Sequence, residues 1–280
     1  MSMRSDGPVL VGFEPSRAGL AALDLAVDAA LGRGLHLVVL HSATDPQRGH
    51  EILASARARA RARARVRAGR APVMIRTEWT SEEPAAALLR HGRESALLVV
   101  GHHGRRGARS GRTMAGSVAL RVATHAAIPV IVHRPAEGCM AGEPTVTVGV
   151  GGIPDDEPLA FAFAEADRLG VPLVVEHVWS CAADSASANA GGDRRVEVAA
   201  FAEAVRLLDD TVAVWSDKFP DVRVRRALRH GLDPAFALTA ASRSARLLVI
   251  GSTAPAAPLI EALVHRARCP VAVVPCGRPS

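Results

Sequence analysis

Residues 97–127 read LLVVGHHGRRGARSGRTMAGSVALRVATHAA. The apolar run at 97–100 is typical of a buried strand, and the pattern from Val118 to Ala127 is typical of a helix. The glycine-rich loop between them lets the backbone approach a phosphate closely, and the helix start supplies free N–H groups. The loop also carries cationic side chains that suit phosphate oxygens: Arg105, Arg106, Arg109 and Arg112. We interpret this stretch as an anion-binding loop, and the alternative is a solvated connection between a strand and a helix.

The chain contains the same series of patterns twice. The matched pairs are VLVG (9–12) with VTVG (146–149), LVVLH (37–41) with LVVEH (173–177), LLVVG (97–101) with LLVIG (247–251), and PVIV (129–132) with PVAV (270–273). Short apolar runs that alternate with helical patterns predict βαβ units and a parallel sheet covered by helices on both faces. We therefore expect an α/β fold with two tandem, five-stranded, Rossmann-like sandwich domains at 1–137 and 144–280. A linker without periodicity lies between them at 136–143.

The two copies differ most after their fourth strand. In the first copy 27 residues separate Gly101 from Pro129, whereas 18 residues separate Gly251 from Pro270. The second connection begins STAPAAP and lacks the glycines, the arginines and the Gly-Ser pair, and its prolines have no N–H to donate. We therefore expect a phosphate site in the first domain and a degenerate one in the second.

An arginine-rich helix accounts for much of the net charge of +6. Arginine alternates with alanine from Arg57 to Arg65, no β-branched residue appears before Val66, and both arginine and alanine favour a helix over a strand. On a helix, Arg57, Arg61 and Arg65 form one stripe and Arg59, Arg63 and Arg67 form another, with narrow alanine strips between them. A solvated helix is the favoured interpretation, and a basic interaction surface is the alternative. No interleaved aromatic residues or helix-turn-helix pattern are present, so nucleic acid is a minority interpretation.

The remaining composition indicates a soluble, cytoplasmic protein without a membrane segment. No apolar run reaches the ~18 residues of a membrane span, and the chain enters its first strand without a signal peptide. The four cysteines lack the spacing of zinc or redox motifs.

Several other candidate sites are rejected on chemical grounds. Residues 107–113 resemble a phosphate-binding P-loop but have the wrong glycine spacing and no lysine. His102 and His103 are adjacent and have no third metal ligand at a useful spacing. His41 and His177 end equivalent strands, which predicts a shared structural hydrogen bond. No catalytic triad or pair of carboxylates is evident, so we expect no catalytic residues and no metal ligands.

These patterns together resemble a tandem member of the universal stress protein family, over nearly the whole chain. ATP-binding members of that family carry G-x2-G-x9-G-[ST] after the fourth strand. Gly101 and Gly104 match the opening glycines, and Gly116 and Ser117 match the closing pair. The spacing departs from the motif because eleven residues, 105–115, replace nine. Two extra residues change loop-closure entropy by only tenths of a kcal/mol, but they can move Ser117.

The resemblance also implies roles for four further residues. Glu14 stands where the family has an acidic residue on the nucleoside side, and Ser42 occupies the position that flanks adenine. Val118 would add a backbone donor, and Arg105 belongs to the loop that would order over the phosphates. In the second half, Gly151 or Gly152 replaces the acidic residue. The implied fold is that of the adenine nucleotide alpha hydrolases.

From this resemblance we expect a stress-response regulator that binds ATP, with or without Mg²⁺, in its first domain. Slow hydrolysis is compatible with this interpretation, but fast catalysis is not expected. The alternative is a nucleotide-independent module that docks acidic partners through its arginine-rich surface. The two domains are expected to meet through their last strands, with pseudo-twofold symmetry as in family dimers. A homodimer of tandem chains and an unidentified protein partner are left open.

Overall fold

The structure is a computed structural model that describes residues 6–68, 73–102, 118–134, 143–151, 156–179, 194–230, 233–252 and 256–277. Strands and helices alternate along the chain, which confirms the predicted α/β fold with a mostly parallel sheet. The chain divides into two compact units. Unit 1 comprises residues 1–136 and 270–277, and unit 2 comprises residues 137–269 and 278–280.

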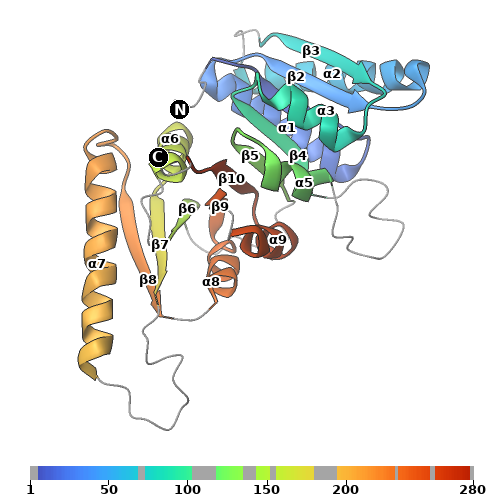
Figure 1. The fold of residues 1–280 in the computed structure, drawn as a ribbon. Helices are drawn as coiled ribbons and strands as arrows, with labels where there is room; N and C mark the ends of the chain where they lie inside the picture. The colour runs from blue at the N-terminus through green and yellow to red at the C-terminus, as the bar shows by residue number, and fades with distance from the viewer. Residues whose placement is uncertain are drawn as a thin grey trace. The chain divides into compact units, whose positions relative to one another are not determined.

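The sheet of unit 1 has the strand order β3-β2-β1-β4-β5-β10 (Figure 1). Its strands are β1 (Val9–Gly12), β2 (Leu37–Ser42), β3 (Ile75–Thr80), β4 (Leu97–Gly101), β5 (Val130–His133) and β10 (Val271–Pro275). The first five are parallel, whereas β10 pairs antiparallel with β5 and places Val273 opposite Val130. The last strands of the two repeats therefore pair within unit 1, as the sequence predicted.

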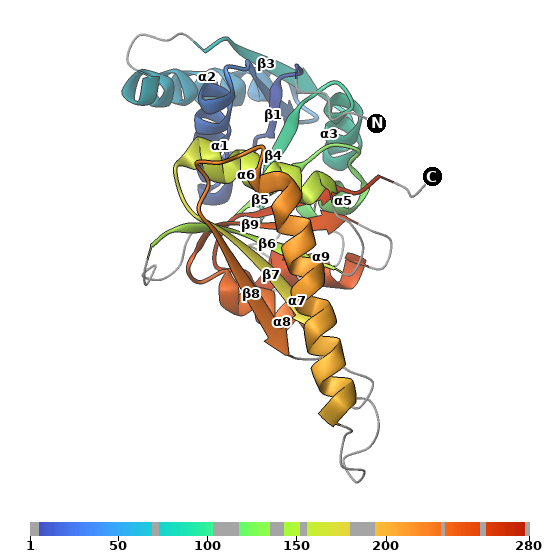
Figure 2. The same ribbon diagram turned by 90° about the vertical axis from the view of Figure 1, so that its left-hand side faces the viewer.

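Helices cover both faces of this sheet. They are α1 (Arg17–Arg33), α2 (Pro46–Ala68), α3 (Pro84–Gly92) and α5 (Val118–His125). Helix α1 packs on β1, β4 and β5 and lies beside α2, which covers β2 and β3, while α3 and α5 pack together on the opposite face (Figures 1 and 2). The chain leaves β1 for β2 in one direction and returns to β4 on the other side of β1. This reversal creates a switch in strand order between β1 and β4.

Small side chains allow α1 and α2 to pack closely on the sheet. In α1 the apolar side is mainly alanine, and Gly34 ends the helix in the left-handed conformation with φ of 66°. Helix α2 is the predicted arginine–alanine helix. It buries one narrow stripe made of Leu53, Ala56, Ala60 and Ala64.

Unit 2 contains four strands in the order β9-β6-β7-β8, which corresponds to β4-β1-β2-β3 of unit 1, whereas the last strand of the second repeat, β10, belongs to unit 1. The strands are β6 (Thr145–Val150), β7 (Leu173–Trp179), β8 (Val224–His230) and β9 (Ala245–Ser252), and they are parallel. The helices are α6 (Asp156–Leu169), α7 (Arg194–Ser216), α8 (Pro234–Ala241) and α9 (Ala257–Arg266). Helices α6 and α7 contact each other, as do α8 and α9. None of the helices in the described ranges is long and apolar enough to cross a membrane.

The two repeats share a buried histidine contact at the end of their second strand. His41 Nδ1 lies 2.8 Å from the carbonyl oxygen of Phe13, and His177 Nδ1 lies 3.0 Å from that of Val150. Both histidines are buried. Each ring therefore ties the second strand to the residue that follows or ends the first strand, which confirms the structural role predicted for this pair.

Candidate functional site

Three of the predicted site residues lie at one edge of the sheet in unit 1. Gly12, the last residue of β1, pairs with Leu40 of β2 and Val100 of β4. Glu14, Ser42 and Gly101 follow these paired residues by one or two positions, so they lie at the carboxyl ends of neighbouring parallel strands. This edge flanks the switch in strand order, where open α/β sheets bind their ligands.

The end of β4 approaches the first turn of α1 closely. A Cβ atom at Gly101 would lie 3.0 Å from both the carbonyl carbon and the carbonyl oxygen of Ala18. Because Ala18 is held in a helix, any side chain at this position would push the two elements apart. Gly101 therefore brings the beginning of the glycine-rich loop next to the N-terminus of α1.

The connection between β1 and α1 holds Glu14 in place through two residues that the sequence interpretation missed. The Ser16 hydroxyl accepts a hydrogen bond from the Gly19 amide (3.1 Å), and the Ser16 amide donates to the carbonyl oxygen of Glu14 (2.7 Å). A Cβ atom at Gly19 would overlap that same carbonyl oxygen. A serine before a helix is a recognisable cap, but the requirement for glycine at position 19 depends on how the chain turns back.

The Ser42 hydroxyl is already used as a donor. It donates a hydrogen bond to the carbonyl oxygen of Glu82, in the connection between β3 and α3. Its oxygen lone pairs are the groups that a ligand could still use, so Ser42 would accept a hydrogen bond rather than donate one.

The end of β5 places a histidine beside Gly101. His133 pairs with Gly101 in the sheet register, and its carbonyl oxygen accepts a hydrogen bond from the His102 amide (3.0 Å). Burial lowers the pKa of His133, and the negative charge of Asp24 opposes this shift without reversing it. Within the described ranges its Nδ1 atom is buried and has no hydrogen-bond partner. No sequence pattern marks this residue as part of a site, apart from its position at a strand end.

The central part of the predicted loop lies outside the described residues. This applies to Gly104, Arg105, Gly116 and Ser117, and also to His103. Val118 is described and is the first residue of α5, where its backbone N–H belongs to the start of the helix. Glu14, Ser42, Gly101 and Val118 are thus the site residues whose positions are defined.

The matching edge of unit 2 has no acidic residue at the position of Glu14. Gly151 stands two residues after Gly149, as Glu14 stands two residues after Gly12, and helix α9, the counterpart of α5, begins at Ala257 without a side-chain cap. In the part of the chain that the structure describes, no group of three or more His, Cys, Asp or Glu could hold a metal ion. The arrangement in unit 1 combines a carboxylate, which accepts hydrogen bonds from hydroxyl groups, with a helix start and a glycine, whose backbone N–H groups are the kind of donor that suits an anion.

Comparisons with known proteins agree with the tandem pattern. The model of the universal stress protein family matches residues 7–134 and again 144–275. A universal stress protein of Mycobacterium tuberculosis is 32% identical over 230 residues, which cover 80% of each chain. Another, from Mycobacterium bovis, is 31% identical over 212 residues, covering 71% of this chain and 68% of the relative.

Solved structures show the same fold at low sequence identity. A universal stress protein of Archaeoglobus fulgidus superposes with a TM-score of 0.69 at 14% identity, covering 99% of both chains. A protein of Pseudomonas aeruginosa described as a putative universal stress protein gives a TM-score of 0.64 at 17% identity, covering 98% of this chain and 95% of that one. With both halves matched by the family model and two relatives above 30% identity, the chain belongs to the universal stress protein family as a tandem, two-domain member.

Proposed function

We propose that the chain is a cytoplasmic stress-response regulator that binds ATP in its first repeat and does not catalyse a fast reaction. The observation that carries this proposal is the close approach of Gly101 to Ala18, 3.0 Å from a would-be Cβ atom, at the switch between β1 and β4. This approach brings the N-terminus of α1 next to the start of the glycine-rich loop, and both a helix N-terminus and a glycine-rich loop supply backbone N–H groups that suit the phosphates of a nucleotide. We take 1–137 and 144–280 as the two repeats.

The defined residues fit an adenine nucleotide in distinct ways. The Glu14 carboxylate can only accept hydrogen bonds when ionised, which suits the hydroxyl groups of a ribose. The Ser42 oxygen can accept from the exocyclic amine of adenine, because its proton is already donated to Glu82. Gly101 and Val118 mark the two ends of the loop that would surround the phosphates.

The loop itself would supply the remaining contacts. In this proposal Gly104, Gly116 and Ser117 offer backbone and hydroxyl donors, and Arg105 adds a guanidinium group for the phosphate oxygens. A Mg²⁺ ion would enter on the phosphates of ATP, since this ion keeps several of its waters and binds substrate phosphates. Micromolar affinity requires only about −8 kcal/mol, which a few charge-assisted hydrogen bonds and a buried base can provide.

Calorimetric titration of ATP into the purified chain tests the proposal directly. The protein is first denatured in a separate sample to check for co-purified nucleotide. We expect one ATP per chain with a Kd of about micromolar magnitude. Two sites per chain would contradict the asymmetry between the repeats, and the absence of both binding and carried nucleotide would contradict the function.

Matched variants assign the site to the first repeat. Gly116→Ala with Ser117→Ala is expected to abolish binding, because it removes the closing pair of the loop. Gly251→Ala changes the counterpart of Gly101 in the second repeat and is expected to leave the ATP affinity unchanged. Equal losses in both variants would show that the site does not lie in the first repeat alone. Titrations with ADP and AMP then define which adenine nucleotide is preferred.

A further inference from the structure

The two arginine stripes of α2 lie on opposite flanks of its buried stripe. Ala56, Ala60 and Ala64 face the sheet, and the helical repeat places Arg59, Arg63 and Arg67 on one side of them. The inner stripe, defined as Arg59, Arg63 and Arg67, faces α1. The outer stripe, defined as Arg57, Arg61 and Arg65, lies on the other flank. The two stripes have the same composition and spacing, so their surroundings decide what each can bind.

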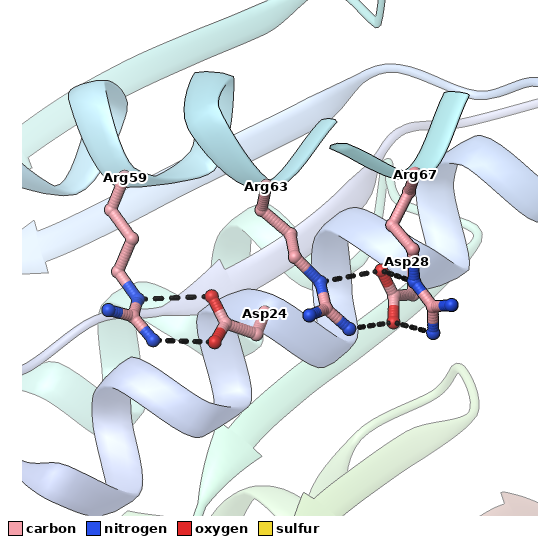
Figure 3. A network of polar contacts seen from close by, with 5 residues as sticks. All are labelled: Asp24, Asp28, Arg59, Arg63 and Arg67. Carbon is pink, nitrogen blue, oxygen red and sulfur yellow. Dashed lines mark hydrogen bonds and ion pairs between the residues drawn. The ribbon is translucent and has the colours of Figure 1, made fainter. Parts of the chain in front are cut away.

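The three arginines of the inner stripe pair with two aspartates of α1 (Figure 3). Arg59 binds Asp24 through Nε (3.0 Å) and Nη2 (2.6 Å). Arg63 binds Asp28 in the same two-pronged way at 3.0 and 2.6 Å, and Arg67 adds a weaker pair at 3.3 and 3.1 Å. Burial alone would raise the pKa of Asp28, but the hydrogen bonds from Arg63 and Arg67 outweigh it and lower that pKa.

The outer stripe has no such partner within the described part of the chain. Its three arginines are exposed, and no described residue forms an ion pair or a hydrogen bond with their side chains. They recur every four residues, which on a helix is a rise of ~6 Å between neighbours. Arg57 and Arg61 are each followed by an exposed alanine, Ala58 and Ala62, whose small side chains leave room for a partner beside the guanidinium groups.

We propose that the outer stripe binds a helix of a partner protein that presents carboxylates at four-residue intervals. Helix α1 provides the template inside the molecule, because Asp24 and Asp28 have this spacing and bind the inner stripe with two-pronged geometry. The planar guanidinium group of arginine frequently binds a carboxylate through two parallel hydrogen bonds, because the two groups match in shape. A second acidic helix against the outer stripe would repeat, on the solvent side, the pairing that already joins α1 to α2.

The surroundings of the outer stripe favour an acidic helix over a nucleic acid. Single-stranded nucleic acids bind where cationic groups alternate with aromatic rings that stack on the bases. Along α2 the sequence neighbours of the outer stripe are alanines and the exposed Val66, so no aromatic ring alternates with its arginines. The indole of Trp79 on β3 is occupied, since its Nε1 donates to the carbonyl oxygen of Ala43 (3.1 Å) and its ring lies 5.9 Å from that of His50.

Designed helical peptides test the proposal with the full chain. The probe is an alanine-based peptide of about 18 residues with glutamates at positions i, i+4 and i+8, labelled for fluorescence anisotropy. An isomer of the same composition carries its glutamates on different faces. We expect the first peptide to bind at least about fivefold more tightly than the isomer at about 50 mM salt, and both to weaken as salt rises.

Charge-matched variants locate the binding site. Replacing Arg57, Arg61 and Arg65 with glutamate is expected to weaken binding of the spaced peptide at least about tenfold, because three attractive pairs become repulsive. The control replaces the exposed Arg243, Arg246 and Arg266 with glutamate. Each replacement of arginine by glutamate lowers the net charge by two, so the three replacements take the net charge from +6 to zero in both variants. The control is expected to stay within about twofold of the unmodified chain.

Several outcomes would overturn the proposal. Equal loss in both variants would mean that net charge alone attracts the peptide, and equal affinity for the isomer would mean that spacing is not recognised. Tighter binding of a single-stranded RNA, lost in the outer-stripe variant, would make this surface a nucleic-acid site. Failure of the spaced peptide to bind would also reject the proposal of an acidic-helix site. If the glutamate variant fails to fold, alanine at the same three positions keeps helix propensity and removes the charges. ATP binding is measured separately, so each proposal can fail alone.

Discussion

The two repeats share a close contact between a strand glycine and a helix leucine, but they differ in the side chains on one face of the sheet. A Cβ atom at Gly12 would lie 2.9 Å from Leu88 Cδ1 of α3, and one at Gly149 would lie 2.8 Å from Leu238 Cδ1 of α8. The helix that crosses this face therefore uses the same leucine-over-glycine contact in both units. Since neither strand can carry a larger side chain there, the contact fixes how closely helix and sheet approach.

The residues beside this contact have opposite polarity in the two repeats. Leu40 pairs with Gly12 in the first repeat, whereas Glu176 pairs with Gly149 in the second, so both side chains lie on the face that bears the glycine. Glu176 is 2% exposed, and burial raises the pKa of its carboxyl group despite the opposing charge of Arg229. Arg229 Nε lies 3.7 Å from Oε1, longer than a hydrogen bond.

This difference shows which structural features both repeats retain and which have changed between them. The glycine contacts and the histidine contacts are set by how strands and helices must approach, and both units keep them. The side chains on the sheet face need only fill the space, and a buried acid is tolerated there at a cost in stability. In the first repeat the turn after β1 also holds Glu14 through Ser16, whereas in the second repeat the described residues stop at Gly151, before the corresponding turn.

Exchanging the paired residues should give the largest effect, with opposite signs in the two units. Leu40→Glu is expected to destabilise unit 1 by about 3–5 kcal/mol, because it buries a charge without a partner. Glu176→Leu is expected to stabilise unit 2 by about 1–2 kcal/mol, because Arg229 is exposed and stays solvated when its partner is removed.

Denaturant unfolding with a single reporter tryptophan measures each unit by itself. Trp79 is the tryptophan of the first repeat, and Trp179 and Trp215 belong to the second. Phenylalanine in place of the other tryptophans leaves one unit visible at a time. Destabilisation by Glu176→Leu would show that the Glu176–Arg229 pair stabilises the fold, contrary to this interpretation.

A methyl group at Gly19 should have the next largest effect. Gly19→Ala is expected to destabilise unit 1 by about 2–3 kcal/mol and to weaken ATP binding, because the new Cβ overlaps the carbonyl oxygen of Glu14. Gly92→Ala is the matched control, since Gly92 also lies in a helix and the nearest atom to its Cβ position is 3.7 Å away. If both variants are equally stable and bind ATP equally well, the turn around Glu14 is more compliant than this contact indicates.

The sequence allowed local features to be predicted better than features that depend on distant pairing. The alanine stripe of α2 and the contacts of His41 and His177 follow from spacing and from repetition, so they could be predicted. The partner of the inner stripe could not, because Asp24 and Asp28 belong to another helix whose rotation depends on packing. The overlap at Gly19 likewise depends on the path of the chain through the turn, which no local pattern specifies.

The pH dependence of unit 1 should show the smallest effect and tests the polar end of β5. When PVIV is aligned with PVAV, His133 of the first repeat corresponds to Val274 of the second. His133→Val therefore gives the first repeat the residue that the second repeat has at this position. Burial lowers the pKa of His133 in the folded state, so the unfolded state binds more protons when the pH falls below the ordinary value of 6.5. The contribution of His133 to stability is therefore complete above that pH and is lost as the pH falls toward the folded-state value. Unfolding is followed through Trp79 between about pH 7.5 and 5 in the chain with phenylalanine at positions 179 and 215, with and without His133→Val. The difference isolates the contribution of His133, because the other titrating groups cancel. We expect the variant to gain stability relative to the unmodified chain as the pH falls. A difference that stays constant would mean that Asp24 balances burial at the end of β5, and a change in favour of the histidine would mean that Asp24 outweighs it; either result contradicts the prediction.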